Sequence, residues 1–245
     1  MRRFFLILLI ILACIWPEAA SAKAEENPAN SLPSAPSQGT KNGRDCFRLF
    51  DASAGGHSWA NAYLLALACH YSYPERLDVP PRAGAAEFER RYREMFEPWG
   101  IDTFDFVYAH GRNLDTELVV MSAKEGDFVV VVFRGSEHLL QDPLGALKDG
   151  AFTDANCRLK DVSRQFGEGV KVHEGFWNAF FPVRKAVREA IEKQGGFSPE
   201  KKLWLTGNSL GAALANLCAM WLRAEGHAVP GVYTYGAPRC GNKAF

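Results

Sequence analysis

The stretch LWLTGNSLGAAL, residues 203–214, passes from an apolar run to a helical pattern, and a serine stands between two glycines where the pattern changes. Ser209 lies two residues after Gly207 and two before Gly211. On a strand-to-helix turn, G-x-S-x-G forms a nucleophile elbow, in which the serine has a strained backbone and projects outward. Side chains at the two flanking positions would collide in such a turn. The stretch therefore predicts an α/β protein with an exposed, nucleophilic serine.

Ser209 has a second interpretation, as the N-cap of the following helix, with the glycines serving close packing. The five-residue motif alone does not decide between the two. Its position between a strand and a helix favours the nucleophile. Unpaired backbone N–H groups and the helix dipole favour negative charge at a helix start, so the N–H of Leu210 is the first donor expected for an oxyanion.

The segments on either side alternate between helical and strand patterns. Helices are predicted over 57–73, 85–96, 173–196 and 210–226, and strands over 104–110, 116–123, 128–135, 202–206 and 232–236. The strand at 128–135 is apolar almost throughout, which predicts a central position covered on both faces. Pro182 must bend the helix at 173–196 or begin it anew. Strands that alternate with helices predict an α/β fold with a largely parallel sheet.

Composition limits the class of protein. The chain has 245 residues, 47% of them hydrophobic, and its formal net charge is zero. This length and apolar content suit one substantial core. The one dense basic run, ERRYRE at 89–94, is interleaved with glutamates like a solvent-exposed helix face, so we expect no nucleic-acid binding. The cysteine spacings resemble no zinc site, and we expect no metal.

The amino terminus has the pattern of an export signal. Residues 1–22 begin with MRR, continue with an apolar run, and end in AASA, whose small residues suit cleavage before Lys23. The apolar run from Phe4 to Trp16 has 13 residues, whereas a membrane-spanning helix needs roughly 20, so a membrane anchor is the less favoured interpretation. A lipid-modified Cys14 is another alternative. We predict a secreted or periplasmic protein.

Residues 23–44 are rich in Pro, Ser, Asn and Gly and have no apolar periodicity. Such a segment cannot bury enough apolar surface to offset the entropy of ordering, so it is predicted to be a disordered linker. The folded domain would then span 45–245. Five cysteines remain after cleavage, and an exported chain could pair some of them, although the odd number leaves one over.

Four further segments, taken together, point to a family. They are VVVVFRGSE (129–137), VHEGFWNAF (172–180), LTGNSLGAALANLCA (205–219) and VYTYGAPRCGNKAF (232–245). In this order they resemble the class 3, or fungal-type, lipase family of α/β-hydrolases, and the likeness spans roughly 115–245. The resemblance implies an α/β-hydrolase fold with a mostly parallel central sheet. It also implies a serine carboxylic-ester hydrolase that acts on lipids without a cofactor.

The resemblance assigns roles to individual residues. Ser136 would supply the second oxyanion contact, beside Leu210, through its N–H and its hydroxyl. His173 would be a packing and hydrogen-bonding residue rather than a catalytic one, and Arg134 and Arg239 would brace loops. The alternative for Ser136 is a plain serine at the end of a strand.

Two residues of the elbow depart from the family pattern. Asn208 stands where histidine is usual, and Ala212 where glycine is usual. Both residues are small or polar, so the turn is expected to survive.

The segment 137–157 corresponds to the family's lid, which covers the serine in water and opens at a lipid surface. Asp142 could cap, and Gly150 end, a short helix in which Leu144 and Leu147 share one face. We expect these leucines to contact lipid. The alternative is a surface loop that packs them into the core.

In α/β-hydrolases the triad follows the chain order Ser, then Asp or Glu, then His. The residues after Ser209 contain no aspartate, and Glu225 and His227 are the only candidates. About sixteen helical residues would place them roughly 24 Å from the serine, beyond a hydrogen bond of about 3 Å. We therefore expect the family's Asp and His, and the carboxyl-terminal part of the fold, to lie beyond Phe245. The chain to that point would hydrolyse little.

Two functions compete at this stage. The first is an exported serine esterase or lipase of the triacylglycerol type. The second is a catalytically inactive relative that binds lipid or another partner. The intact GNSLG and FRGS segments favour the first, because a binding protein needs neither a strained elbow nor oxyanion donors.

Overall fold

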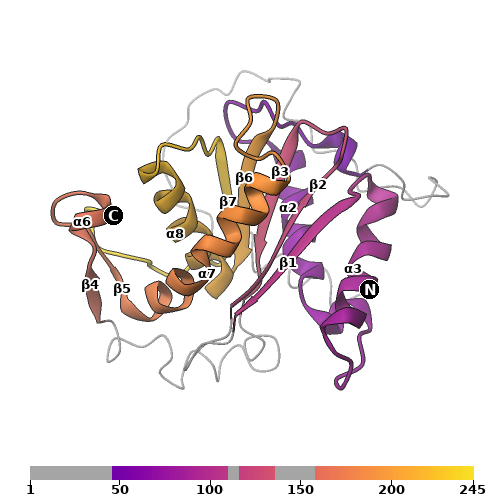
Figure 1. Ribbon diagram of the computed structural model, residues 1–245, viewed down its shortest axis with the longest axis horizontal. Coiled ribbons are helices and arrows are strands. Elements are labelled where there is room, and N and C mark those ends of the chain that lie inside the picture. Colours follow the sequence, from indigo (N-terminus) through magenta and orange to yellow (C-terminus); the bar gives the residue numbers. More distant parts are fainter. Residues whose placement is uncertain (1–45, 110–115, 136–157) are drawn as a thin grey trace, which may run out of the picture. The chain divides into compact units, whose positions relative to one another are not determined.

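The structure of the chain is a computed structural model that describes residues 46–109, 116–135 and 158–245 (Figure 1). The predicted signal peptide at 1–22 and linker at 23–44 lie outside these ranges. So do Ser136 and the predicted lid residues Leu144 and Leu147.

The described residues alternate between helices and strands, as the sequence predicts. In chain order the elements are η2 (Cys46–Leu49), α2 (Trp59–Tyr71), η3 (Pro74–Leu77), α3 (Ala85–Phe96), η4 (Glu97–Trp99), β1 (Thr103–Ala109), β2 (Thr116–Ser122), β3 (Phe128–Phe133), β4 (Leu159–Asp161), α6 (Ser163–Phe166), β5 (Lys171–His173), α7 (Glu174–Lys193), β6 (Lys202–Asn208), α8 (Leu210–Ala224) and β7 (Gly231–Tyr235).

The main sheet has the strand order β1-β2-β3-β6-β7. β2 pairs antiparallel with both β1 and β3, whereas β3–β6 and β6–β7 are parallel pairs. Four of these five strands therefore run in one direction and only β2 opposes them. The predicted α/β fold with a mostly parallel sheet is confirmed. β3 is central, and every residue of it is buried.

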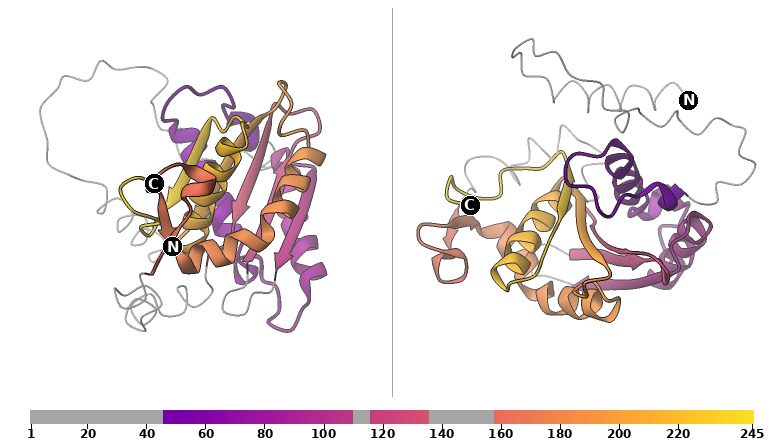
Figure 2. Two further views of the ribbon diagram at one scale, coloured as in Figure 1. Left: turned by 60° about the vertical axis from the view of Figure 1, so that its left-hand side comes forward. Right: turned by 90° about the horizontal axis from the view of Figure 1, so that it is seen from above.

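Helices cover both faces of this sheet (Figure 2, right). The alternation of side chains along a strand divides β3 between two hydrophobic clusters. Val129, Val131 and Phe133 pack with residues of α7 and α8, while Phe128, Val130 and Val132 pack with residues of α2 and α3. Burial on both faces explains why the sequence of β3 is a continuous apolar run rather than an alternating one.

Pro182 does not restart α7, so that alternative from the sequence is wrong. The helix runs continuously from Glu174 to Lys193 with the proline inside it, although its ribbon changes direction along its length (Figure 2, left). An interior proline costs roughly 3 kcal/mol in a helix. Buried side chains on both sides of it, including Phe180 and Val183, pack on the sheet and offset this cost.

A second, small sheet was not predicted. β4 and β5 form an antiparallel pair, and the chain after β7 runs beside β5. The His173 N–H donates to the Cys240 carbonyl at 2.7 Å, and the Asn242 N–H donates to the Lys171 carbonyl at 2.9 Å. These bonds hold the start of α7 against the segment that follows β7.

None of the described helices is both long enough and apolar enough to cross a lipid bilayer.

Candidate active site

The turn between β6 and α8 has an unusual backbone conformation at Ser209. β6 ends at Asn208, α8 begins at Leu210, and Ser209 between them has φ 52° and ψ −119°. Among the described non-glycine residues, only Ser209 and Asp78 have positive φ. Such a conformation costs on the order of 1–3 kcal/mol and persists only where the surrounding structure imposes it. The predicted strand-turn-helix with a strained serine is present.

The two flanking glycines leave no room for a side chain. A Cβ atom on Gly207 would lie 2.2 Å from the Gly211 carbonyl oxygen, and one on Gly211 would lie 2.2 Å from the Phe133 carbonyl oxygen. All the nearest atoms belong to the backbone, which cannot move aside as a flexible side chain can. The glycines therefore let α8 begin in direct contact with the end of β3.

The side chain of Ser209 does not cap α8, although the residue stands at the N-cap position. By contrast, the Ser58 hydroxyl caps α2 by accepting from the Asn61 N–H at 3.3 Å. The Ser209 carbonyl accepts from Ala212 and Ala213, at 3.0 and 3.3 Å. The N-cap interpretation does not describe this turn, and the serine hydroxyl is not used for capping.

The start of α8 offers backbone donors beside Ser209. The first N–H groups of a helix have no intrahelical acceptor. Within the described ranges, the N–H groups of Leu210 and Gly211 have no backbone acceptor either. The Leu210 side chain is buried, which holds this end of the helix in place.

Arg134 lies at the end of β3, two residues before the predicted oxyanion residue Ser136 in the sequence. Its guanidinium forms an ion pair with Glu117 of β2, and both side chains are largely buried. Its N–H also donates to the Glu117 carbonyl at 3.0 Å. These contacts support the predicted bracing role. Arg239 contacts its own loop, where Nε donates to the Gly241 carbonyl at 3.0 Å.

Asn208, the residue that departs from the family's usual histidine, is held by two tyrosines. Its Nδ2 donates to the Tyr235 carbonyl at 3.2 Å, and the Tyr73 hydroxyl donates to its Oδ1 at 3.2 Å. The Ser209 N–H donates to the same Tyr235 carbonyl at 2.8 Å. Ala212 is fully buried at the start of α8. Neither tyrosine was predicted from the sequence to belong to the site.

His173 is the N-cap of α7, in keeping with the predicted hydrogen-bonding role. Its Nδ1 accepts from the Phe176 N–H at 3.3 Å, and its ring packs on the Phe176 ring, with centroids 4.2 Å apart. Burial lowers the pKa of His173, and the Glu174 carboxylate acts against this lowering. Nδ1 accepts only in the neutral imidazole, so protonation removes the cap.

A lowered pKa in the folded state predicts a pH-dependent stability. The contribution of His173 is fully present above its unfolded pKa of about 6.5 and is lost as the pH falls through the folded value. We expect His173→Asn, which keeps an N-cap acceptor, to be more stable than His173→Ala by about 1 kcal/mol at pH 8. His173→Asn should also lose less stability than the wild type between pH 7 and pH 5. Urea unfolding at several pH values measures both, and equal stability of the two variants would contradict the capping role.

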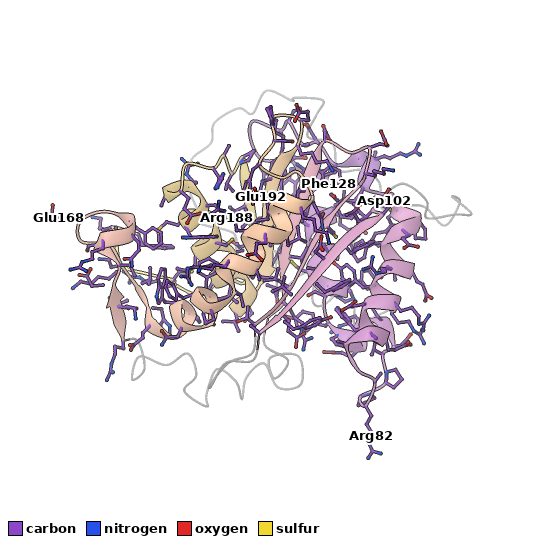
Figure 3. The ribbon with its side chains drawn as sticks, in the orientation of Figure 1. Arg82, Asp102, Phe128, Glu168, Arg188 and Glu192 are labelled. Atoms are coloured by element: carbon purple, nitrogen blue, oxygen red, sulfur yellow. The ribbon has the colours of Figure 1, made fainter. Side chains whose placement is uncertain are left out.

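Glu225 and His227 lie at the far end of α8 from Ser209. The helix has 15 residues, which corresponds to about 22 Å. Glu225 faces Arg188 of α7, with 3.9 Å between the charged atoms, and the His227 ring stacks on Phe197 at 3.8 Å. Figure 3 labels Arg188 on α7. Neither residue can take a proton from Ser209, as the sequence predicts.

Of the four described cysteines, Cys46, Cys69, Cys218 and Cys240, the last three are free thiols. Cys157, the remaining cysteine of the predicted mature chain, lies outside the described ranges. In the part of the chain that the structure describes, no group of His, Cys, Asp and Glu side chains could hold a metal ion.

A mostly parallel sheet and a strained serine on a strand-to-helix turn between obligatory glycines define the nucleophile elbow of the α/β-hydrolases. Residues 130–245 match the family described as Lipase (class 3). Over this region, which is slightly less than half of the chain, the protein is similar to the class 3 lipases.

Individual relatives agree with this assignment. The chain is 29% identical over 143 residues to the secreted mono- and diacylglycerol lipase A of Penicillium cyclopium, a match that covers 58% of this chain and 43% of the relative. It is 40% identical over 99 residues to a secreted mono- and diacylglycerol lipase of Malassezia restricta, covering 38% of this chain and 32% of the relative. The chain thus spans less than half the length of these relatives.

Solved structures support the fold. The lipase from Rhizopus microsporus var. chinensis superposes with a TM-score of 0.52 at 24% identity, over 75% of this chain and 58% of that one. At this identity the likeness concerns the fold alone.

Proposed function

We propose that this protein is a serine carboxylic-ester hydrolase, a lipase acting on triacylglycerol-type lipids, and that Ser209 is its nucleophile. One observation carries the proposal. Ser209 is held at φ 52° with a hydroxyl that does not cap the helix it precedes. A strained residue at such a position has a structural cost and no structural benefit of its own, so a role in the chemistry accounts for it.

In the proposed reaction the Ser209 oxygen attacks the ester carbonyl while a general base takes its proton. The N–H groups of Leu210 and Ser136 stabilise the resulting oxyanion. The intermediate collapses, and the alcohol leaves with the proton from the base. Water then attacks the acyl-enzyme by the same route and releases the acid. These steps require no metal and no organic cofactor.

The base in this proposal is a histidine outside the described residues, as the family resemblance implies. His227 is excluded by its place at the far end of α8, and His173 uses its Nδ1 to cap α7. The alternative function, an inactive lipase-like protein that binds lipid or a partner, retains the same fold with an unreactive serine.

Covalent labelling separates the two functions. The exported protein should react with a fluorophosphonate probe, and digestion followed by mass spectrometry should place the label on the peptide that contains Ser209. Heat-denatured protein is the control and should remain unlabelled, because reactivity depends on the folded site. Folded protein that stays unlabelled would favour the binding alternative.

We also propose that Leu144 and Leu147 belong to a lid that contacts the lipid surface. The double substitution Leu144→Ser with Leu147→Ser should lower the ratio of activity on emulsified ester to activity on dissolved ester, since polar side chains disfavour contact with the interface. Both activities can be followed with tributyrin above and below its solubility. An unchanged ratio would show that the leucines pack elsewhere.

Export through a cleaved signal peptide completes the proposal. The relatives named above are secreted lipases, and the first residues of this chain have the charge and apolar pattern of such a peptide. Amino-terminal sequencing of the exported protein should begin at Lys23. A mature protein that still carries the apolar run would contradict cleavage.

A further inference from the structure

Tyr73 lies between α2 and η3, far from Ser209 in sequence, yet its hydroxyl reaches the elbow. The side chain is 4% exposed. Burial raises the pKa of its phenol to about 12, and a backbone hydrogen bond with Gly135 acts against this rise. The phenol therefore keeps its proton at neutral pH and can donate one hydrogen bond.

The direction of the hydrogen bonds around Asn208 follows from its partners. The Tyr235 carbonyl can only accept, so the amide Nδ2 must face it, as it does at 3.2 Å. Oδ1 then faces Tyr73 and can only accept, so the phenol donates to it at 3.2 Å. Reversing the amide would leave two acceptors facing each other at Tyr235. The Tyr235 carbonyl thus determines the amide orientation, and the Tyr73 hydroxyl meets the remaining amide oxygen as a donor.

Tyr73 also contacts the chain that leaves β3. A Cβ atom on Gly135 would lie 2.4 Å from the Tyr73 hydroxyl oxygen and 2.5 Å from the Asn208 carbonyl oxygen. Gly135 therefore lies directly against both groups. One hydroxyl connects the end of β3 with the residue before Ser209.

From this arrangement we propose that Tyr73 is a positioning residue for Ser209. Its hydroxyl, which lies against Gly135, holds the Asn208 side-chain amide on the Tyr235 carbonyl. That carbonyl also accepts the Ser209 N–H at 2.8 Å. Removing the hydroxyl frees the Asn208 amide and loosens the strained turn. The effect on catalysis rests on the function proposed above, whereas the effect on the turn does not.

Hydrogen–deuterium exchange tests the effect on the turn without requiring activity. In Tyr73→Phe, peptides that cover 206–212 should exchange about five- to tenfold faster than in the wild type, as expected for the loss of one buried hydrogen bond. Tyr71→Phe is the matched control. Tyr71 lies two residues before Tyr73, its ring packs on Phe96 and Trp99, and the substitution removes only its hydroxyl. Unchanged exchange in Tyr73→Phe, or the same increase in Tyr71→Phe, would overturn the proposal.

A double-mutant cycle tests the route through Asn208. If Tyr73 acts through this amide, Tyr73→Phe should change the exchange of 206–212 less than twofold in an Asn208→Ala background. If the fold-changes in exchange rate caused by the two single substitutions simply multiply in the double variant, Tyr73 acts by another route and the proposal is wrong.

The consequence for catalysis is measured on the exported protein with p-nitrophenyl butyrate. Tyr73→Phe should lower kcat about tenfold and change KM less than twofold, because the serine and not the substrate site is displaced. If Ser209→Ala leaves hydrolysis unchanged, the proposed function fails and the exchange result still decides the role of Tyr73 at the turn. If Ser209→Ala abolishes hydrolysis while Tyr73→Phe keeps the wild-type kcat, only the positioning role in catalysis fails.

Discussion

Gly211→Ala should destabilise the protein by about 1–3 kcal/mol or more, the range for overpacking a closely packed site. Helix propensity predicts the opposite sign, because alanine stabilises a helix interior by up to about 1 kcal/mol relative to glycine. The steric conflict at this position outweighs the gain in helix propensity. The added Cβ would lie 2.2 Å from the Phe133 carbonyl oxygen and 2.9 Å from the Arg134 carbonyl carbon. The start of α8 would have to move away from β3, and Ser209 would move with it.

The measurement is the urea midpoint of unfolding, together with the rate of fluorophosphonate labelling at Ser209. Both should fall in Gly211→Ala. Gly56→Ala is the control, since a Cβ at Gly56 meets no atom within 4 Å and its φ is not positive. Stability equal to or above that of the wild type in Gly211→Ala would show that the helix can shift at little cost, and the tight contact between α8 and β3 would then not be required.

The elements that the sequence predicts best are those whose pattern is long and local. The helix at 85–96 is found with the predicted bounds because its apolar residues recur with the helical period and its charges lie on the other face. The central place of β3 follows from its apolar run. Elsewhere the predicted strand and helix ends differ from the observed ones by up to three residues, as at the end of α7, since the last residues of an element depend on the neighbouring chain.

The small sheet could not be predicted in the same way. β4 and β5 have three residues each, and all three residues of β4 are exposed. Three residues are too few for an apolar alternation to be recognised, and β5 pairs in addition with the chain at Gly241. Such pairing consists of backbone bonds between distant segments, which leave no periodic signal. The same limit applies to Pro182, where packing on the sheet outweighs a local rule.

In the candidate site, too, the residues of a local motif could be predicted and the residues in distant contacts could not. Gly207, Ser209 and Gly211 were predictable because the conflict that excludes side chains arises within one turn. Tyr73 and Tyr235 were not, because their contacts with Asn208 join residues 135 and 27 positions apart. The Tyr73 contact is made by a side-chain hydroxyl and the Tyr235 contact by a backbone carbonyl, and neither kind of contact leaves a periodic pattern in the sequence. A useful signal was available in Asn208 itself, since a polar residue at a position usually held by histidine requires new partners.

Ser209→Ala should reduce kcat/KM for ester hydrolysis by about 10⁴- to 10⁶-fold in the active protein, the loss seen when a nucleophilic serine is removed from a triad. The N–H groups at the start of α8 remain in this variant, so a residual rate of about 10³–10⁴ over water is expected from the oxyanion donors and from binding. KM should change little, because the hydroxyl acts mainly in the transition state. Ser209→Ala should also relieve no steric conflict, so its stability should stay within about 1 kcal/mol of the wild type.

Hydrolysis of p-nitrophenyl butyrate measures this loss, and Ser198→Ala serves as the control. Ser198 lies before the start of β6 and Ser209 directly after its end, so the control removes a hydroxyl at the opposite end of the same strand. A Ser209→Ala variant that retains more than a tenth of the wild-type kcat/KM would exclude the serine as the nucleophile. The strain at φ 52° would then need another cause. A loss confined to Ser209→Ala would connect that strain to the chemistry, because the turn that holds the serine outside the capping geometry is the same turn that leaves its oxygen available to attack an ester.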